Sequence, residues 1–349
     1  MIALAILSLS SAQAFELRDG GDALEVFGRV RTGWTARFVD DDDHDHTAFL
    51  VDQARLGVGG ALAHALSFEV QVDLAGGGVN PKDLWIGWSP SWWVEVRAGQ
   101  QKVPVSWDRL QSMGKFAFAA RPSLTSDLVP GRDIGVLGAL HSDSRKLSLQ
   151  LGAFTGRGDN VALDDEAGMP LLAGRLQLMP LAEVRAGHGD VRRTGKLAIS
   201  LALNGSWTEE RADAAILEPG PLDPVDGTRL MGGGDAVLKY RGLFLEAELL
   251  QARATPFEGD PWISGGYLLQ GGYYCDRLRL EPSLRFEDFN PSDTAAGDRE
   301  RTLDGAISLF PTRSHDLKIT ADYRHRLPRE GGDMGWKEDD LTVLAQLAF

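Results

Sequence analysis

The sequence predicts an all-β protein: a transmembrane antiparallel β-barrel of about sixteen strands, with long external loops and mostly short periplasmic turns. Most segments alternate apolar and polar residues with a period of two, which is the period of a strand and not of a helix. These segments are near the roughly 9–11 residues that a tilted membrane-crossing strand needs. The connections between them also alternate, one long and the next short, as in outer-membrane barrels.

Residues 1–14 have the pattern of a secretory signal peptide. The segment is short, apolar and uncharged, and it ends in Ala12-Gln13-Ala14, a small-x-small cleavage pattern. A positively charged start is missing, so an apolar N-terminus that stays attached is the alternative. Residues 15–349 are expected to form one barrel domain, since no later segment has the roughly 18 apolar residues of a membrane-spanning helix.

The first expected strand, residues 24–38, shows the alternation clearly. Val26 and Val30 fall on one face, and Arg29 and Arg31 fall on the other. The same two-faced pattern recurs in residues 64–74, 92–101, 276–287, 315–326 and 341–349. A secreted soluble β-sandwich would alternate too and stays an alternative. The strand lengths and the connections favour a closed barrel, which pairs every backbone donor and acceptor.

The connections fall into two classes. Long ones are expected at residues 39–48, 75–82, 103–131, 156–170, 207–229, 255–261, 288–299 and 327–338. Short ones are expected at residues 62–64, 89–91, 142–145, 240–242, 275–276 and 311–314. Residues 180–194 break the rule, because a long connection stands where a short one is due. In this segmentation both chain ends fall on the short-turn side.

The composition excludes several classes of protein. The chain has 349 residues and a formal net charge of −14, whereas a general nucleic-acid binder needs a basic face. Hydrophobic residues make up 43% and charged residues 25%, which disfavours disorder of the whole chain. A single cysteine, Cys275, cannot form an intramolecular disulfide. We therefore expect no nucleic-acid partner, and no cofactor is implied.

Four segments carry a family resemblance. Residues 49–60 read FLVDQARLGVGG, and residues 99–106 read GQQKVPVS. Arg121 is followed after a gap by GRDIGV at residues 131–136, and residues 152–156 read GAFTG. These runs resemble the second strand, the strand into the third loop, the exit of that loop and a recurring strand end of the phosphate-selective porin O and P family.

The resemblance implies an outer-membrane porin of a Gram-negative-type bacterium. Implied with it are a sixteen-stranded barrel in outer-membrane lipid, a homotrimer, and a third loop, residues 103–131, that folds inward to narrow the pore. Phe349 is similar to the terminal aromatic residue that the outer-membrane barrel assembly machinery reads. Family members that select phosphate owe this to basic residues on the inward loop and to a ladder of lumenal arginines.

The third loop supplies the candidate constriction. Its charged residues are Asp108, Arg109, Lys115, Arg121 and Asp127. This is a sparse basic set and not a dense lysine cluster, which leaves phosphate as one candidate among small anions. The predicted function is passive diffusion of small hydrophilic solutes, with a preference for anions. If ion preference survives neutral replacement of Arg109, Lys115 and Arg121 together, this loop does not set it.

The strand alternation predicts a lumenal charge ladder. Its members are Arg29, Arg31, Arg37, Arg55, Arg97, Arg277, Arg279 and Arg285. Arginines lining a narrow pore attract anions and oppose cations. The alternative is that they pair across strands with lumenal carboxylates such as Glu69, Asp73 and Glu95, and only stiffen the wall. A barrel with such a closed lumen would be a structural or surface-binding protein without transport.

Metal binding and catalysis receive little support. The run at residues 40–46, DDDDHDH, makes Asp43, His44, Asp45 and His46 a weak metal candidate. Charge runs of this kind are usually solvated loops. No histidine lies in a nucleophile motif, and His188 and His315 are expected in short-side connections, remote from any shared site. We predict that the chain is not an enzyme; an outer-membrane hydrolase is the weaker alternative.

Overall fold

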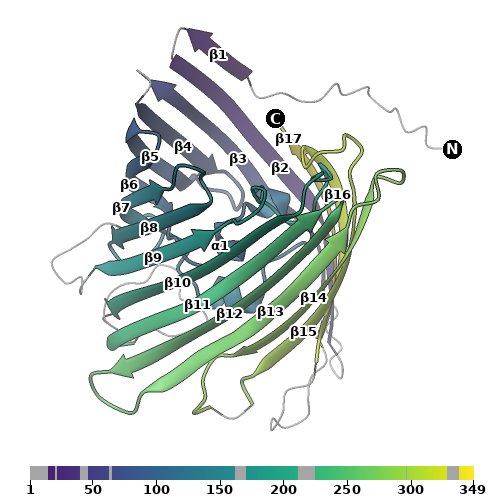
Figure 1. The fold of residues 1–349 in the computed structure, drawn as a ribbon. Coiled ribbons are helices and arrows are strands. Elements are labelled where there is room, and N and C mark those ends of the chain that lie inside the picture. The colour runs from purple at the N-terminus through teal and green to yellow at the C-terminus, as the bar shows by residue number, and fades with distance from the viewer. Residues whose placement is uncertain are drawn as a thin grey trace.

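The strands wind into a barrel whose wall follows the chain order (Figure 1). The computed structural model describes residues 15–19, 22–39, 46–62, 65–161, 170–210, 225–295, 297–327 and 338–349. Their strands are β1 (Phe15–Asp19), β2 (Asp22–Val39), β3 (His46–Leu62), β4 (Leu66–Asp73), β5 (Asn80–Ser91), β6 (Val94–Lys102), β7 (Arg132–His141), β8 (Leu147–Phe154), β9 (Leu171–Leu178), β10 (Ala198–Glu210), β11 (Gly227–Tyr240), β12 (Leu243–Pro256), β13 (Trp262–Tyr273), β14 (Leu280–Asn290), β15 (Glu300–Leu309), β16 (Leu317–Arg326) and β17 (Glu338–Ala348).

The barrel is closed by the pairing of β17 with β2. Every strand from β2 to β17 is antiparallel to its neighbours in sequence, so the wall has sixteen strands. At the closure, the Phe349 amide donates to the Gly28 carbonyl and the Gly28 amide donates to the Phe349 carbonyl, both at 3.0 Å. The short β1 pairs with the first residues of β2. The predicted all-β antiparallel barrel is confirmed.

The two faces of the wall differ in chemistry, as β12 illustrates. Leu245 and Leu249 point outward and are 46% and 63% exposed. Glu246 and Glu248 alternate with them and are each 3% exposed, because they point into the barrel. An apolar outer face and a polar inner face are what a barrel in lipid requires. In the described residues no helix has both the length and the apolar character to cross a membrane.

The connections sort the two ends of the barrel. Tight turns such as Arg241-Gly242 join strands at the end where the chain terminates, and longer connections join them at the other end (Figure 1). Two segments depart from simple loops. We call residues 103–131, between β6 and β7, the inward loop, and residues 179–197, between β9 and β10, the inward connection. The latter is long at the short-turn end, as the sequence indicates.

The inward loop contains α1 (Trp107–Leu110), a 3-10 turn (Met113–Lys115) and α2 (Ser123–Asp127). Its apolar residues provide a core inside the barrel. Val103, Val105 and Leu124 are fully buried in a cluster with wall residues, among them Leu250 and Leu268. Burial of this apolar surface places the loop against the inner wall rather than over the barrel mouth. Figure 1 shows α1 within the ring of strands.

Candidate functional site

The inward loop is held by carboxylates of the opposite wall. The Ser106 hydroxyl and the Asp108 amide each donate to the Glu248 carboxylate at 2.7 Å. The Ala119 amide donates to Asp322 Oδ2 at 2.7 Å, and the Leu124 amide donates to Glu287. These wall carboxylates satisfy backbone donors that a helix start and an irregular loop would otherwise leave unpaired.

Basic wall residues bind the carbonyls of the same loop. Lys318 Nζ donates to the Phe116 carbonyl at 2.6 Å and to the Gly114 carbonyl at 3.2 Å. Arg31 donates to the Met113 carbonyl at 2.9 Å and to the Ala119 carbonyl. Arg285 Nη1 donates to the Ala120 carbonyl at 3.0 Å. The inner wall thus uses charges of both signs to fix one loop.

Four arginines of the predicted ladder pair with carboxylates of a neighbouring strand. Arg55 Nε lies 2.8 Å from Asp73 and Arg37 Nε 2.9 Å from Asp340, whereas Arg97 Nε lies 2.6 Å from Glu95 of its own strand, β6. Arg31 Nε lies 2.7 Å from Asp52, which a register shift after Arg31 leaves as an extra residue on β3. Arg285 and Arg324 share Asp304. The same arginines therefore pair with carboxylates and contribute to the electric field of the lumen.

Arg29 differs from these arginines. Its guanidinium donates to Gln53 Oε1 at 2.9 Å and to the Ser112 hydroxyl at 2.8 Å. Among the described residues it has no carboxylate within ion-pair distance. Its guanidinium is therefore held by neutral side chains where it meets the inward loop.

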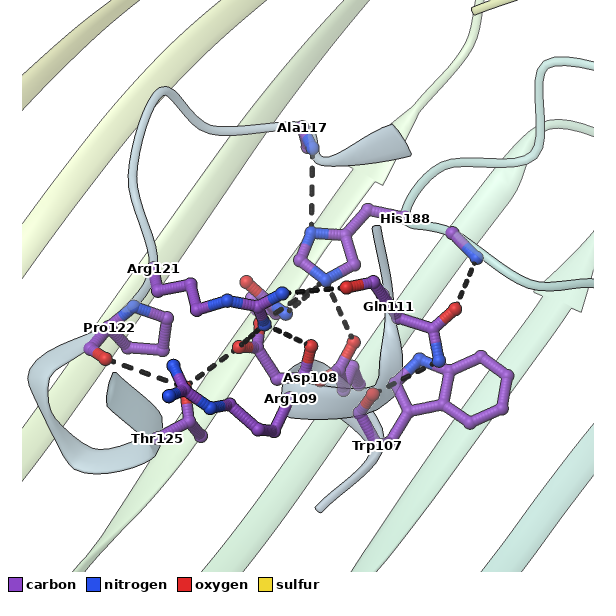
Figure 2. A network of polar contacts seen from close by, with 12 residues as sticks. Trp107, Asp108, Arg109, Gln111, Ala117, Arg121, Pro122, Thr125 and His188 are labelled. Atoms are coloured by element: carbon purple, nitrogen blue, oxygen red, sulfur yellow. Dashed lines mark hydrogen bonds and ion pairs between the residues drawn. The ribbon is translucent and has the colours of Figure 1, made fainter. Parts of the chain in front are cut away.

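The candidate constriction residues take different environments. Arg121 Nη1 lies 3.0 Å from Asp108 Oδ2, which also accepts from the Thr125 hydroxyl at 2.7 Å (Figure 2). Burial, together with the charge of Arg121, lowers the pKa of Arg109 to about 10, so Arg109 stays cationic at neutral pH. Lys115 is exposed. Asp127 accepts from the Ser126 hydroxyl at 2.7 Å, and burial raises its pKa.

The inward connection lies against the inward loop, so the prediction that His188 is remote is wrong. The His188 amide donates to the Lys115 carbonyl at 2.8 Å, and the Gly187 amide donates to Gln111 Oε1 at 2.6 Å. Lys239 of β11 donates to the Arg185 and Gly187 carbonyls at 3.0 and 2.5 Å. Two glycines with positive φ around His188 allow the inward bend, and a Gly-His-Gly run in an over-long connection was the available sequence signal.

His188 enters a buried cluster of acidic residues. Its Nε2 lies 3.3 Å from Asp108 Oδ1 and 3.7 Å from Glu246 Oε2. The ring stacks on Phe116 at 4.1 Å and lies 5.4 Å from Phe244. Burial lowers the pKa of His188 to about 4, so the ring is neutral at neutral pH. Among the described residues, Asp108, His188 and Glu246 form the one group whose ligand atoms are close enough to hold a metal ion.

Two cavities lie beside the inward loop. A cavity of about 400 Å³ is lined by Arg37, Arg324, Arg326, Asp322 and Asp340, with His46 and Ala119. A second, of about 280 Å³, is lined by Lys115, Arg185, Arg192, Lys239, Asp190 and Asp316, with His188 and His315. His188 and His315 thus share a cavity, contrary to the prediction that neither lies near a shared site.

A match to a family model shows which protein family the chain belongs to. The model of phosphate-selective porin O and P matches residues 25–218, more than half of the chain. The chain belongs to the phosphate-selective porin O and P family. This confirms the resemblance seen in the sequence, and the porin is an outer-membrane barrel protein of a Gram-negative bacterium. No curated protein matches the sequence.

Solved structures share the fold of the porin at low sequence identity. The anion-selective porin from Comamonas acidovorans is 15% identical with a TM-score of 0.65, covering 94% of this chain and 100% of its own. OmpT of Vibrio cholerae in its trimer form is 12% identical with a TM-score of 0.59, covering 94% and 99%. The channel DcaP of Acinetobacter baumannii is 12% identical with a TM-score of 0.60, covering 94% and 98%.

Two further predictions concern Arg277 with Arg279 and the acidic run at residues 40–46. Arg277 and Arg279 are exposed in the turn between β13 and β14, so their assignment to the lumenal ladder of the porin is wrong. The turn spans residues 274–279, longer than the two residues predicted, and takes both arginines out of the wall. Asp43, His44 and Asp45 lie outside the described residues, as does the expected signal peptide. His46 begins β3 and lines the larger cavity.

Proposed function

We propose that this porin is a passive diffusion channel for small hydrophilic solutes with a preference for anions, and that the inward loop narrows its lumen. The family and the fold point to a channel and not to an enzyme. The anion preference rests on the chemistry of the described lumen. A preference for anions is opposite to what the net charge of the whole chain, −14, would favour.

The observation that carries the preference is the balance of charges in the two cavities. The smaller cavity has four basic side chains, Lys115, Arg185, Arg192 and Lys239, against two acidic ones, Asp190 and Asp316. The larger has three arginines against two aspartates among the described residues. In a confined, low-dielectric space such an excess raises the local concentration of anions. Acidic residues on external loops act at a greater distance and are screened by salt.

Reversal potentials in planar bilayers test this proposal. The refolded porin is inserted under a KCl gradient, and we expect a chloride-biased potential. The double variant Arg185→Gln/Arg192→Gln should move the potential toward potassium. Arg277→Gln/Arg279→Gln is the matched control, because it removes the same charge from the same end of the barrel without touching either cavity. Equal shifts in both double variants, or a potassium bias of the unmodified porin, would contradict the proposal.

Replacement of Arg109, Lys115 and Arg121 by glutamine asks whether the inward loop or the inward connection sets the preference. Arg121 pairs with the buried Asp108, so the variant without that change, Arg109→Gln/Lys115→Gln, is compared with it.

Phosphate is proposed as one permeant anion: phosphate added to the chloride solution should reduce chloride current by occupying the basic cavities. An unchanged current at high phosphate would exclude phosphate binding in the lumen.

We also propose a homotrimer, since OmpT of Vibrio cholerae is described in a trimer form. Light scattering of the detergent-solubilised porin should give three chains per particle. We propose further that Phe349 is read by the barrel assembly machinery. Deletion of Phe349 should lower the amount of porin in the outer membrane while leaving refolding in detergent possible. One chain per particle, or normal membrane levels of the deletion variant, would contradict these two proposals respectively.

A second candidate function is a structural or surface-binding barrel without transport. The hydrogen bonds that fix both inward segments inside the wall favour it, because they hold polypeptide where solutes would pass. Correctly folded, heat-modifiable porin that gives no conductance steps would support this function over the channel.

A further inference from the structure

We propose that Asp108, His188 and Glu246 bind one divalent transition-metal cation of the Zn²⁺ type, which fastens the inward loop to the inward connection and to β12. The three residues come from these three separate parts of the chain. Binding does not depend on which solute the porin passes, so the proposal stands apart from the proposed function.

The geometry matches a coordination sphere. His188 Nε2 lies 3.3 Å from Asp108 Oδ1 and 3.7 Å from Glu246 Oε2, and all three ligand atoms lie within 4.8 Å of one another. Zinc binds imidazole nitrogen and carboxylate oxygen at about 2.0–2.2 Å, which places neighbouring ligands of a tetrahedral ion roughly 3.3–3.6 Å apart. The two separations from His188 are therefore close to those of ligands around one ion.

Unsatisfied oxygens provide independent support. Asp108 Oδ1 and both carboxylate oxygens of Glu246 are buried without a hydrogen-bond partner among the described residues, and Gln270 Oε1 is in the same state. Glu246 is 3% exposed. A buried carboxylate without a partner is costly, and an ion is one of the few explanations for several such oxygens in one place.

The charges around the cluster also need a cation. Asp108, Glu246 and Glu248 contribute carboxylates, while Arg121 is the guanidinium that pairs with Asp108. Glu248 is already occupied by the Ser106 hydroxyl and the Asp108 amide. A divalent ion between Asp108 and Glu246 would balance the negative charge that remains once Arg121 has paired with Asp108.

The surrounding residues hold the ligands in place. Asp108 Oδ2 is fixed by Arg121 and by the Thr125 hydroxyl, which leaves Oδ1 to face His188 (Figure 2). Phe116 and Phe244 flank the imidazole ring. Such supporting contacts orient metal ligands in proteins. His188 also lines the cavity of about 280 Å³, which provides a path for the ion.

Metal binding has two local costs. The ligand atom His188 Nε2 lies 3.3 Å from the Gln270 side-chain nitrogen, and this contact is lost when the ion binds. A neutral imidazole that binds metal through Nε2 carries its proton on Nδ1. His188 Nδ1 lies 3.4 Å from the Ala117 amide nitrogen, at the long limit of a hydrogen bond. This weak contact has to open when the ion binds. The same step therefore moves the Ala117 segment of the inward loop and couples metal loading to the lumen.

Calorimetric titration of the full chain, refolded in detergent and stripped with EDTA, tests the site with Zn²⁺ alone. The titration uses the background His44→Asn/His46→Asn, so that the acidic run near β3 cannot supply the signal. We expect one Zn²⁺ per chain. Co²⁺ in its place should give the strong visible absorption of a tetrahedral nitrogen and oxygen site.

Variants locate the ion. His188→Asn and the nearly isosteric Glu246→Gln should each weaken Zn²⁺ binding by about 100-fold or more, and Thr125→Val by roughly tenfold. His325→Gln is the matched control, because it removes another histidine–carboxylate pair, His325 with Asp339 at 2.6 Å, outside the cluster. Heat-modifiable mobility on gels confirms folding of each variant. No Zn²⁺ binding in the background chain, or unchanged affinity in both His188→Asn and Glu246→Gln, would overturn the proposal.

Discussion

The inward loop and the inward connection both fill the lumen, but they are anchored differently. The inward loop is bound by side chains from many wall strands, including Arg31 of β2, Glu248 of β12 and Lys318 of β16. The inward connection is bound by Lys239 of β11, by the backbone of the turn at Arg241-Gly242 and, through Gln111 and Lys115, by the inward loop. The barrel therefore holds both segments, but the inward loop depends on wall side chains from many strands, whereas the connection depends on the wall, its end turns and the loop together.

Removal of the inward connection should have the largest effect. Replacing residues 183–194 with an Asn-Gly turn deletes Arg185, His188 and Arg192 but leaves the wall contacts of the inward loop. Because conductance follows the width of the lumen, we expect single-channel conductance to rise about twofold or more. The chloride bias should fall at the same time. Planar-bilayer recordings measure both.

Shortening the external connection at residues 257–260 is the control for this deletion, since it removes chain at the other end of the barrel. If both deletions change conductance equally, or if neither does, the inward connection does not narrow the lumen.

Loss of one wall anchor should have an intermediate effect. Lys318→Met removes the donor to the Gly114 and Phe116 carbonyls. Gly114 still accepts from Gln346, but the buried Phe116 carbonyl loses its side-chain donor, at a cost of about 1–3 kcal/mol. We expect noisier open-channel current and a lower unfolding temperature. Lys146→Met is the control, because its ammonium donates to the Pro180 carbonyl at an exposed site. Quiet current and unchanged unfolding in Lys318→Met would show that other anchors suffice.

The sequence predicts the wall well because the period of two is a local property of each strand. The predicted loop at residues 103–131 matches the gap between β6 and β7 to within one residue. The reason is that the alternation of apolar and polar residues stops at Lys102 and resumes at Arg132. The prediction that Arg277 and Arg279 face the lumen is wrong for the same reason. Their alternation continues that of β14, and nothing in the side-chain pattern indicates that Arg279 turns the chain with a φ of 56°.

The cluster around His188 was beyond such reasoning. Its members are separated by long stretches of sequence, and they meet only because two irregular segments fold into the same lumen. The sequence indicates Asp108 only as a charge of the inward loop, and Glu246 lies on a strand far along the chain. The approach of His188 to both depends on which way the inward connection bends, and that is decided by glycines whose φ values are not visible in the sequence.

The smallest expected effect tests whether the two inward segments move independently. Gly189 has a φ of 69°, and a Cβ there would meet the Glu281 carboxylate. Gly189→Ala should destabilise the inward connection locally by about 1–2 kcal/mol. Hydrogen exchange should accelerate in peptides covering residues 185–192 and stay unchanged in those covering residues 112–120, because the wall still holds the loop.

Gly195→Ala is the matched control for this change, since Gly195 lies in the same connection and has open space where a Cβ would go. It should leave exchange unchanged in both segments. If Gly189→Ala instead accelerates exchange in both segments equally, the His188–Lys115 and Gly187–Gln111 contacts join them into one cooperative unit. The inward loop would then depend on the connection as much as the connection depends on the loop.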